Sequence, residues 1–163
     1  MAGWWARKIR RTAGYWRANA GPHERRELEG WLTPAQLELF DRMHRADKRH
    51  GLDVVAAVRG HGVDDRDLLV AGLLHDAGKG RSVGLAHRIA WSLGQKYGAW
   101  VWRLTGRLPT FGSGLDRLRR HAAISADLAE KAGCSPRTVE LIRRQEEPVD
   151  EAGRLLQAAD DAN

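Results

Sequence analysis

The stretch LLVAGLLHDAGKG, Leu68 to Gly80, decides the fold of this chain. Its first seven residues are apolar enough for a buried helix, and the glycines that follow indicate where the helix ends. The apolar run nevertheless closes on His75 and Asp76. Because a buried carboxylate needs a partner or a metal ion, the sequence predicts that distant residues complete a site at these two positions.

Length and composition are those of one ordinary globular domain. The chain has 163 residues, of which 42% are hydrophobic and 29% charged, which is enough for a sizeable core. Its single cysteine, Cys134, excludes an internal disulfide framework and favours a cytoplasmic location. The longest apolar stretch, 83–104, is interrupted by His87, Arg88 and Lys96, so no transmembrane span is predicted. The composition indicates no oligomeric state.

The formal net charge of +6 is concentrated at the start of the chain. Residues 1–17 carry five basic side chains, three tryptophans and no acid, and they lack the apolar core of a secretory signal. We expect a basic amphipathic helix whose tryptophans pack onto the domain. A weak contact of residues 1–17 with an anionic membrane or a nucleic acid is the alternative interpretation. The predicted division is a basic, Trp-rich N-terminal helical segment, 1–31, and one domain, 32–163.

Helix signals recur along the chain, and no strand-like alternation stands out. Three residues that favour N-cap positions precede apolar, helix-periodic stretches: Thr33, Asp47 and Asp64. Further helices are expected at 83–104, 121–131, 136–145 and 151–163, and Ser135-Pro136 is expected to begin the third of these. Residues 107–116, rich in glycine and containing a proline, are expected to form a loop. The predicted fold class is all-α, a compact bundle of several helices.

His75 and Asp76 offer an imidazole and a carboxylate, both good ligands for divalent transition metals. Adjacent helical residues point about 100° apart, so both side chains can reach one ion at a helix end. Two further candidate ligands belong to other apolar helices: His50 lies 25 positions before His75, and Asp160 ends the last helix.

The order His50, His75-Asp76, Asp160 over an all-α chain, with the stretch LLHDAGK intact, resembles the HD-domain superfamily of metal-dependent phosphohydrolases. The resemblance covers residues 32–163 and is nearest to the HDIG and HD-GYP-like branch. It implies a compact HD-domain bundle that holds a divalent ion through these four residues. His44 competes for the first ligand position, but RHGLDVVAAV matches the family's first helix better and favours His50.

The resemblance leaves the number of metal ions open. Some branches add further histidines and bind two ions, and here His121 keeps the first of these positions. Gln145 and Glu146 stand where a histidine pair is expected, and glutamine is a poor ligand for a transition metal. A site for one ion is the main interpretation. A second ion held by His121 and Glu146, or a degraded site without turnover, are the alternatives.

The function implied by the resemblance is hydrolysis of a phosphate ester, in a nucleotide or a related phosphomonoester or diester, by a metal-activated water. Asp76, Lys79 and His121 are the candidate catalytic residues: Lys79 would bind phosphate, and His121 would bind phosphate or protonate the leaving oxygen. Looser candidates for phosphate binding are Arg81, Arg119 and Arg120. Substrate specificity is expected to come from residues 83–118.

Mn²⁺ is the first expectation for the ion, with Fe²⁺, Co²⁺, Ni²⁺, Zn²⁺ and Mg²⁺ open. The alternative function is that of a catalytically inactive regulatory protein that binds metal and nucleotide. The missing histidine pair disfavours a di-iron oxygenase.

Overall fold

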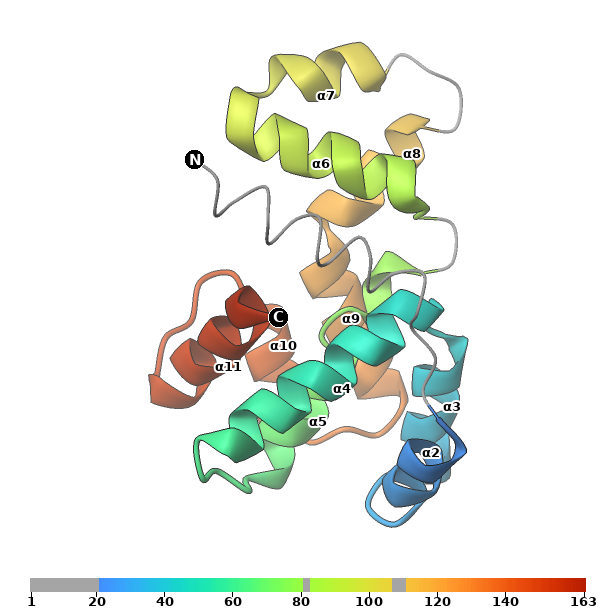
Figure 1. The fold of residues 1–163 in the computed structure, drawn as a ribbon, viewed down its shortest axis with the longest axis vertical. Helices are drawn as coiled ribbons and strands as arrows, with labels where there is room; N and C mark the ends of the chain where they lie inside the picture. The colour runs from blue at the N-terminus through green and yellow to red at the C-terminus, as the bar shows by residue number, and fades with distance from the viewer. Residues whose placement is uncertain (1–20, 81–82, 107–110) are drawn as a thin grey trace.

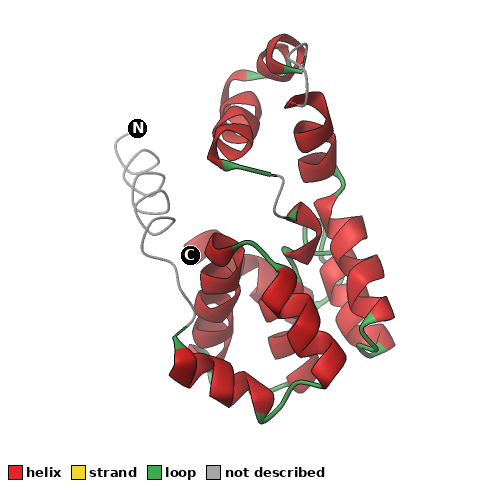
Figure 2. Ribbon diagram, turned by 90° about the vertical axis from the view of Figure 1, so that its right-hand side faces the viewer, coloured by secondary structure: helices red, strands yellow, loops and turns green. Residues whose placement is uncertain are grey.

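The computed structural model describes residues 21–80, 83–106 and 111–163, and all regular structure in these ranges is helical, with no strand (Figure 2). The elements follow one another along the chain as α2 (Pro22–Glu29), α3 (Pro34–Arg42), α4 (Arg45–Gly60), α5 (Arg66–Leu74), the 3₁₀ turn η1 (Ala77–Lys79), α6 (Leu85–Tyr97), α7 (Trp100–Thr105), α8 (Phe111–Arg119), α9 (His121–Lys131), α10 (Pro136–Arg143) and α11 (Glu151–Ala162). The predicted all-α fold class is confirmed.

The core forms around α5, whose residues from Leu68 to Leu74 are all buried. Helices α3, α4, α10 and α11 all contact it, so the most apolar stretch of the sequence lies at the centre of the bundle (Figure 1). Burying each leucine or valine of this helix contributes about 1.5–3 kcal/mol. Because the core fixes α5 on every side, it also fixes His75 and Asp76, which follow directly.

The predicted cap at Thr33 is confirmed, and so is the start of α10 at Ser135-Pro136. The Thr33 hydroxyl accepts a hydrogen bond from the Gln36 backbone, and the Gln36 side chain accepts one from the Thr33 backbone. Ser135 accepts from the backbone N–H of Thr138. Each side chain satisfies a backbone donor that a helix leaves unpaired at its start.

The predicted cap at Asp47 is wrong. Helix α4 begins earlier, at Arg45, and His44 caps it through Nδ1, which accepts from the Ala46 backbone N–H at 3.2 Å. Asp47 is buried inside the first turn, where Arg88 of α6 donates two hydrogen bonds to its carboxylate at 2.6 and 2.7 Å. A partner 41 positions away therefore overrides the local preference of aspartate for a cap.

Asp65 rather than Asp64 caps α5, accepting from the Leu68 backbone N–H. The predicted loop 107–116 is also wrong over 111–116, which belong to α8; residues 107–110 lie outside the described ranges. Helix α8 buries Leu115 and Leu118. Gly114 does not form a turn here; it allows α8 to pack closely on α6, because a Cβ at this position would lie 2.3 Å from the His87 ring.

The apolar stretch 83–104 forms two helices instead of one, because Gly98 adopts a positive φ of 106° between them. Helices α6 and α7 form a hairpin at the end of the molecule away from α4, α5 and α11 (Figure 1). Within the described residues, no helix combines the length and apolar character that crossing a membrane requires.

The predicted N-terminal segment is described only in part. Helix α2 contributes Leu28 to the same hydrophobic core as α5. The predicted basic helix, 1–17, lies outside the described residues.

Replacing Gly51 by alanine is expected to destabilise the fold by about 3 kcal/mol, because its Cβ would lie 2.5 Å from the Leu73 carbonyl oxygen of α5. Gly60, on the same helix, has no heavy atom within 4 Å of a Cβ, so Gly60→Ala should cost nothing or stabilise slightly. Urea denaturation of both variants measures the difference. Equal stabilities would show that α4 and α5 do not pack this closely.

Candidate metal centre

His75 immediately follows α5 and is fully buried, with 1% of its surface exposed. Its Nδ1 donates a hydrogen bond to the Gly72 carbonyl oxygen at 2.8 Å, which places the lone pair of the neutral ring on Nε2. That Nε2 is buried and has no hydrogen-bond partner. A histidine oriented by a backbone carbonyl with its other nitrogen left open has the arrangement typical of metal ligands.

Two side chains from other helices meet this open nitrogen. Asp160 Oδ1, from α11, lies 3.7 Å from His75 Nε2, and His50 Nε2, from α4, lies 2.7 Å from the same oxygen. The ligand atoms of His50, His75 and Asp160 all lie within 4.8 Å of one another, so these three residues could hold a metal ion. Residues 110 positions apart in the sequence thus meet at the end of α5.

Asp76, the fourth predicted ligand, lies beside this group of three. It is 2% exposed; its Oδ1 is 3.5 Å from His75 Nε2 and 3.6 Å from His121 Nε2, and its Oδ2 is 4.0 Å from His50 Nε2. Lys79 Nζ donates to Oδ2 at 2.5 Å. The Asp76 carboxylate therefore lies within 4.0 Å of the imidazoles of His50, His75 and His121, and its Oδ2 also accepts a hydrogen bond from the Lys79 ammonium group.

The ionisation of the centre favours a bound cation. Burial lowers the pKa of His75, but the carboxylates of Asp76 and Asp160 raise it, and the result is a pKa of about 9. Burial raises the pKa of Asp160, but its contacts with His50 and His75 hold it well below its usual range. The raised pKa of His75 reflects the negative potential of the two carboxylates, and in the metal-free protein a proton on His75 balances it.

Metal affinity is expected to rise with pH. An ion must displace the His75 proton, so between about pH 7 and pH 9 the association constant should increase about tenfold per pH unit. Conversely, the metal-free fold should lose stability as the pH rises through about 9, because the folded state binds this proton more tightly than the unfolded state, where the pKa is 6.5. Calorimetric titration with Mn²⁺ across this range measures the first effect; a flat profile would contradict the assignment of His75 as a ligand.

His121, the first residue of α9, faces Asp76 with the nitrogen that can accept a proton. Its Nδ1 donates to the Leu118 carbonyl oxygen at 2.7 Å, so the lone pair of the neutral ring is on Nε2. Burial and the nearby Lys79 lower the pKa of His121. Glu146, its predicted partner for a second ion, approaches the protonated Nδ1 at 3.9 Å and is largely exposed. The two side chains do not present their ligand atoms to a common point.

Gln145, which stands where the resemblance leads us to expect a histidine, is buried and donates a hydrogen bond to the His75 carbonyl oxygen at 3.3 Å. Its side-chain amide contacts the backbone of His75 and offers no ligand atom to the candidate site. This contact favours a site for one ion.

The glycines of HDAGKG bring η1 against α9. A Cβ at Gly78 would lie 2.4 Å from the His121 carbonyl oxygen, and the Gly78 backbone N–H donates to Ser125 Oγ at 2.8 Å. This close approach holds His121 and Asp76 within 3.6 Å of each other. The motif is therefore a packing requirement as well as a source of candidate ligands.

Arg117 of α8 is a candidate phosphate-binding residue that the sequence did not single out. Its Nε donates to the Gly78 carbonyl oxygen at 2.7 Å, and its guanidinium lies against Gly80. Of the predicted arginines, Arg119 is exposed, Arg120 pairs with Asp116 on the surface, and Arg81 lies outside the described residues. Arg117, Arg119 and Arg120 look equivalent in sequence, and only the register of α8 determines that Arg117 is the one that reaches Gly78.

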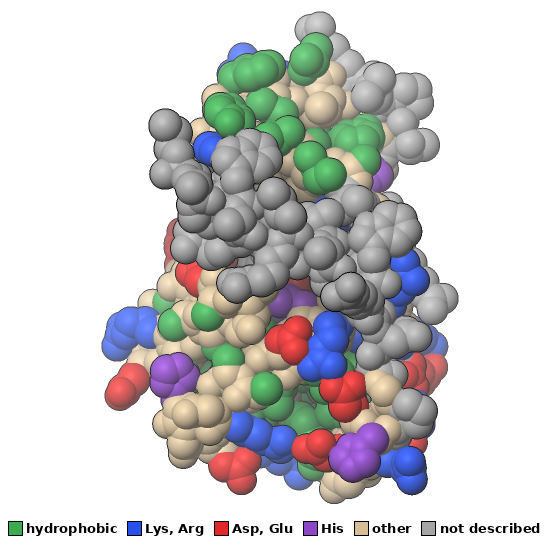
Figure 3. All heavy atoms as spheres, in the orientation of Figure 1, with side chains coloured by type: hydrophobic (Ala, Val, Ile, Leu, Met, Phe, Trp, Pro, Cys, Tyr) green, Lys and Arg blue, Asp and Glu red, His purple; other side chains and the backbone are tan. Residues whose placement is uncertain are grey.

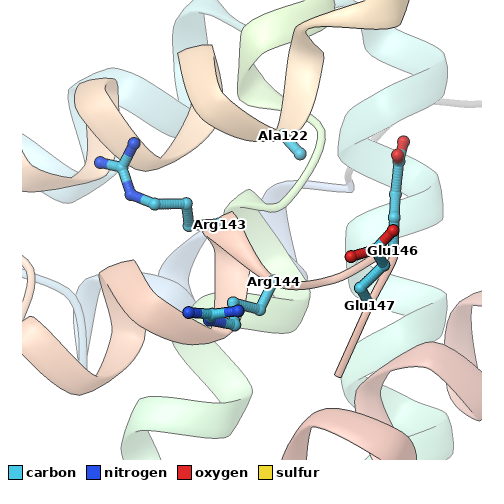
Figure 4. Close-up of a pocket in the computed structure, with 5 residues that line it drawn as sticks. All are labelled: Ala122, Arg143, Arg144, Glu146 and Glu147. Atoms are coloured by element: carbon cyan, nitrogen blue, oxygen red, sulfur yellow. The ribbon is translucent and has the colours of Figure 1, made fainter. Parts of the chain in front are cut away.

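A pocket of about 160 Å³ lies beside His121, and none of His50, His75, Asp76 and Asp160 lines it. It is lined by Ala122 of α9, by Arg143 and Arg144 at the end of α10, and by Glu146 and Glu147 of the loop that follows (Figure 4). The opposite charges on its walls leave it without a strong preference for an anion.

The remaining described histidines lie away from the centre. His44 is the cap of α4, His61 follows the end of α4, and His87 stacks on Phe111 at 4.3 Å, as expected of a packed residue. His23 lies in α2.

Comparison with protein-family models, curated proteins and solved structures finds no match for the chain. The resemblance to the HD-domain superfamily therefore rests on the LLHDAGK stretch and the ordered ligand positions alone.

Proposed function

We propose that this chain is an HD-type metal-dependent phosphohydrolase that cleaves a phosphate ester in a nucleotide or a related phosphomonoester or diester. One observation carries the proposal: the buried Nε2 of His75 has no hydrogen-bond partner and is surrounded by Asp76, Asp160 and His50. Leaving a buried nitrogen unpaired costs stability, and a bound divalent ion removes that cost.

The ion would be held by His50, His75 and Asp160, with Asp76 as the fourth ligand. Mixed imidazole and carboxylate ligands suit Mn²⁺ first, with Fe²⁺, Co²⁺, Ni²⁺, Zn²⁺ and Mg²⁺ as further candidates. A divalent ion supplies two things to phosphate chemistry: it lowers the pKa of water and polarises a phosphoryl oxygen. We place the protein in the cytoplasm, where its lone Cys134 stays reduced.

Lys79 and Arg117 would bind the phosphate. Lys79 is partly exposed and uses Asp76 as its counter-ion. Arg117 uses Nε to hold the Gly78 carbonyl oxygen, and within the described part of the chain its two amino groups have no hydrogen-bond partner. Phosphoryl transfer depends mainly on positioning and charge stabilisation, and two cationic groups beside the centre supply both.

His121 would accept a proton instead of donating one. Its proton is held on Nδ1 by the Leu118 carbonyl oxygen, and its lowered pKa keeps the ring neutral near pH 7. The free lone pair on Nε2, 3.6 Å from Asp76 Oδ1, is directed into the centre. His121 therefore suits the role of a general base better than protonation of the leaving oxygen.

Phosphate release from p-nitrophenyl phosphate, bis-p-nitrophenyl phosphate and a panel of nucleotides tests the proposal. The protein is stripped with a chelator and assayed before and after Mn²⁺ is restored. Turnover that requires Mn²⁺ and disappears in His75→Gln, but persists in the surface variant Asp161→Asn, would support it. Absence of turnover on every substrate with every candidate ion would reject it.

A second candidate function is a catalytically inactive regulatory protein that binds metal and nucleotide. The observation in its favour is Gln145, whose amide is tied to the His75 backbone where a further ligand is expected. Calorimetry that shows Mn²⁺-dependent nucleotide binding, with no inorganic phosphate released from the bound nucleotide, would favour this function over hydrolysis.

A further inference from the structure

Exposed apolar side chains gather on the hairpin of α6 and α7. Of the five large hydrophobic residues exposed in the described ranges, four lie here: Ile89, Tyr97, Trp100 and Leu104, with 41%, 51%, 60% and 61% of their surfaces exposed. We call them the α6–α7 face. Figure 3 shows hydrophobic side chains concentrated over these two helices. Large aromatic and aliphatic side chains gathered at one end of a molecule indicate an interaction surface.

Stacked tryptophans join the two helices of this hairpin. Trp91 of α6 and Trp102 of α7 stack on each other with ring centroids 4.7 Å apart, and Trp102 Nε1 donates to the Trp91 carbonyl oxygen. The stack requires glycine at position 94, because the Cβ of any other residue there would lie 1.8 Å from Trp102 Nε1. Trp100 and Leu104, four positions apart on α7, share one side of that helix, and Trp100 Nε1 donates to the Tyr97 carbonyl oxygen.

Helices α6 and α7 contain three basic side chains, Arg88, Lys96 and Arg103, and no acidic one, although Arg88 is paired with Asp47 of α4. Residues 77–115 contain six basic side chains, and residues 1–23 contain five, but none of the 21 acidic residues of the chain lies in either range. The same two ranges hold six of the seven tryptophans and both tyrosines. The rest of the chain carries more acidic than basic residues. Along the sequence, cationic and aromatic residues are therefore concentrated in these two ranges, and the acidic residues in the rest of the chain.

We propose that the α6–α7 face binds the surface of an anionic phospholipid bilayer. Trp100, Leu104 and Tyr97 would enter the interface between headgroups and acyl chains, and Arg103 would contact lipid phosphates. Tryptophan and tyrosine favour this interface, and basic residues near it are attracted by anionic lipids. This proposal goes beyond the proposed function and does not depend on it.

Two other occupants fit the observations less well. A nucleic acid would use the basic and aromatic side chains but gains little from exposed Leu104 and Ile89. A second copy of the chain would bring two acid-free, basic faces together, and they would repel each other.

Co-sedimentation of the full chain with vesicles tests the proposal, using phosphatidylcholine alone and phosphatidylcholine mixed with phosphatidylglycerol. The wild type should bind the mixed vesicles and bind less as salt increases. The double variant Trp100→Ser/Leu104→Ser should bind at least about tenfold more weakly. Val149→Ser, which removes an apolar side chain 58% exposed elsewhere, should bind like the wild type.

A charge comparison completes the test. Arg103→Glu should weaken vesicle binding, whereas Lys131→Glu, an equal change of charge at an exposed position of α9, should not. Thermal melting of each variant shows that it is folded. Unchanged binding by the folded double variant would overturn the proposal, even if deletion of residues 1–20 abolished binding. So would a preference for nucleic acid over vesicles, or conversion of a dimer to a monomer by the double variant without loss of vesicle binding.

Discussion

Replacing Asp160 by asparagine is expected to weaken binding of a divalent ion by about 100-fold or more and to abolish metal-dependent turnover. The Asp160 carboxylate lies 2.7 Å from His50 Nε2 and 3.7 Å from His75 Nε2, so it is the oxygen that both imidazoles share. An amide in its place keeps the shape but removes the negative charge. Because Asp160 lies at the exposed end of α11, the variant should still fold.

Asp161→Asn is the matched control, since it changes the neighbouring residue in the same way on an exposed side of the same helix. Calorimetric titration of both variants with Mn²⁺ measures the difference. If the two variants bind the ion equally well, Asp160 is not a ligand and the ion, if any, is held elsewhere.

Replacing Lys79 by methionine is expected to lower the rate of phosphate-ester hydrolysis by about 100- to 1,000-fold, the effect of removing one charge-stabilising donor. Its ammonium group lies 2.5 Å from Asp76 Oδ2, at the edge of the centre where a phosphate would approach. Metal binding should be retained or become tighter, because Lys79 is the largest of the charges that compete with an ion for Asp76.

Steady-state hydrolysis of p-nitrophenyl phosphate by Lys79→Met, beside Lys131→Met as a surface control, measures this effect, and calorimetry measures the retained Mn²⁺ affinity. A variant that turns over at the wild-type rate would remove Lys79 from phosphate binding. One that has lost the ion would show that Lys79 supports the centre structurally.

The sequence predicted the helices well where one local signal dominates. Thr33 and Ser135 cap their helices as expected because the cap and its partner lie three residues apart. The predictions of a cap at Asp47 and of a loop over 111–116 failed because a distant residue decided the outcome. Arg88 draws Asp47 into the interior, and the packing of Gly114 against His87 turns an apparent loop residue into a helix residue.

In the candidate metal centre, too, the identity of the residues could be predicted from the sequence, but the contacts made by packing could not. His50, His75 and Asp160 were predicted from the resemblance of their order along the chain to the HD-domain superfamily, and the structure brings them together. What the sequence could not supply was orientation. Which nitrogen of His121 faces Asp76, which of three neighbouring arginines reaches Gly78, and that Gln145 turns to the His75 backbone all depend on helix register and packing.

The metal content of the reconstituted wild-type protein, measured by plasma mass spectrometry beside Asp76→Ala and His121→Ala, tests the central claim most directly. We predict about one ion per chain, lost in Asp76→Ala and kept in His121→Ala. Two ions in the wild type, one of them lost in His121→Ala, would contradict the assignment of a single ion. No ion after reconstitution with any candidate divalent metal would contradict the metal centre itself.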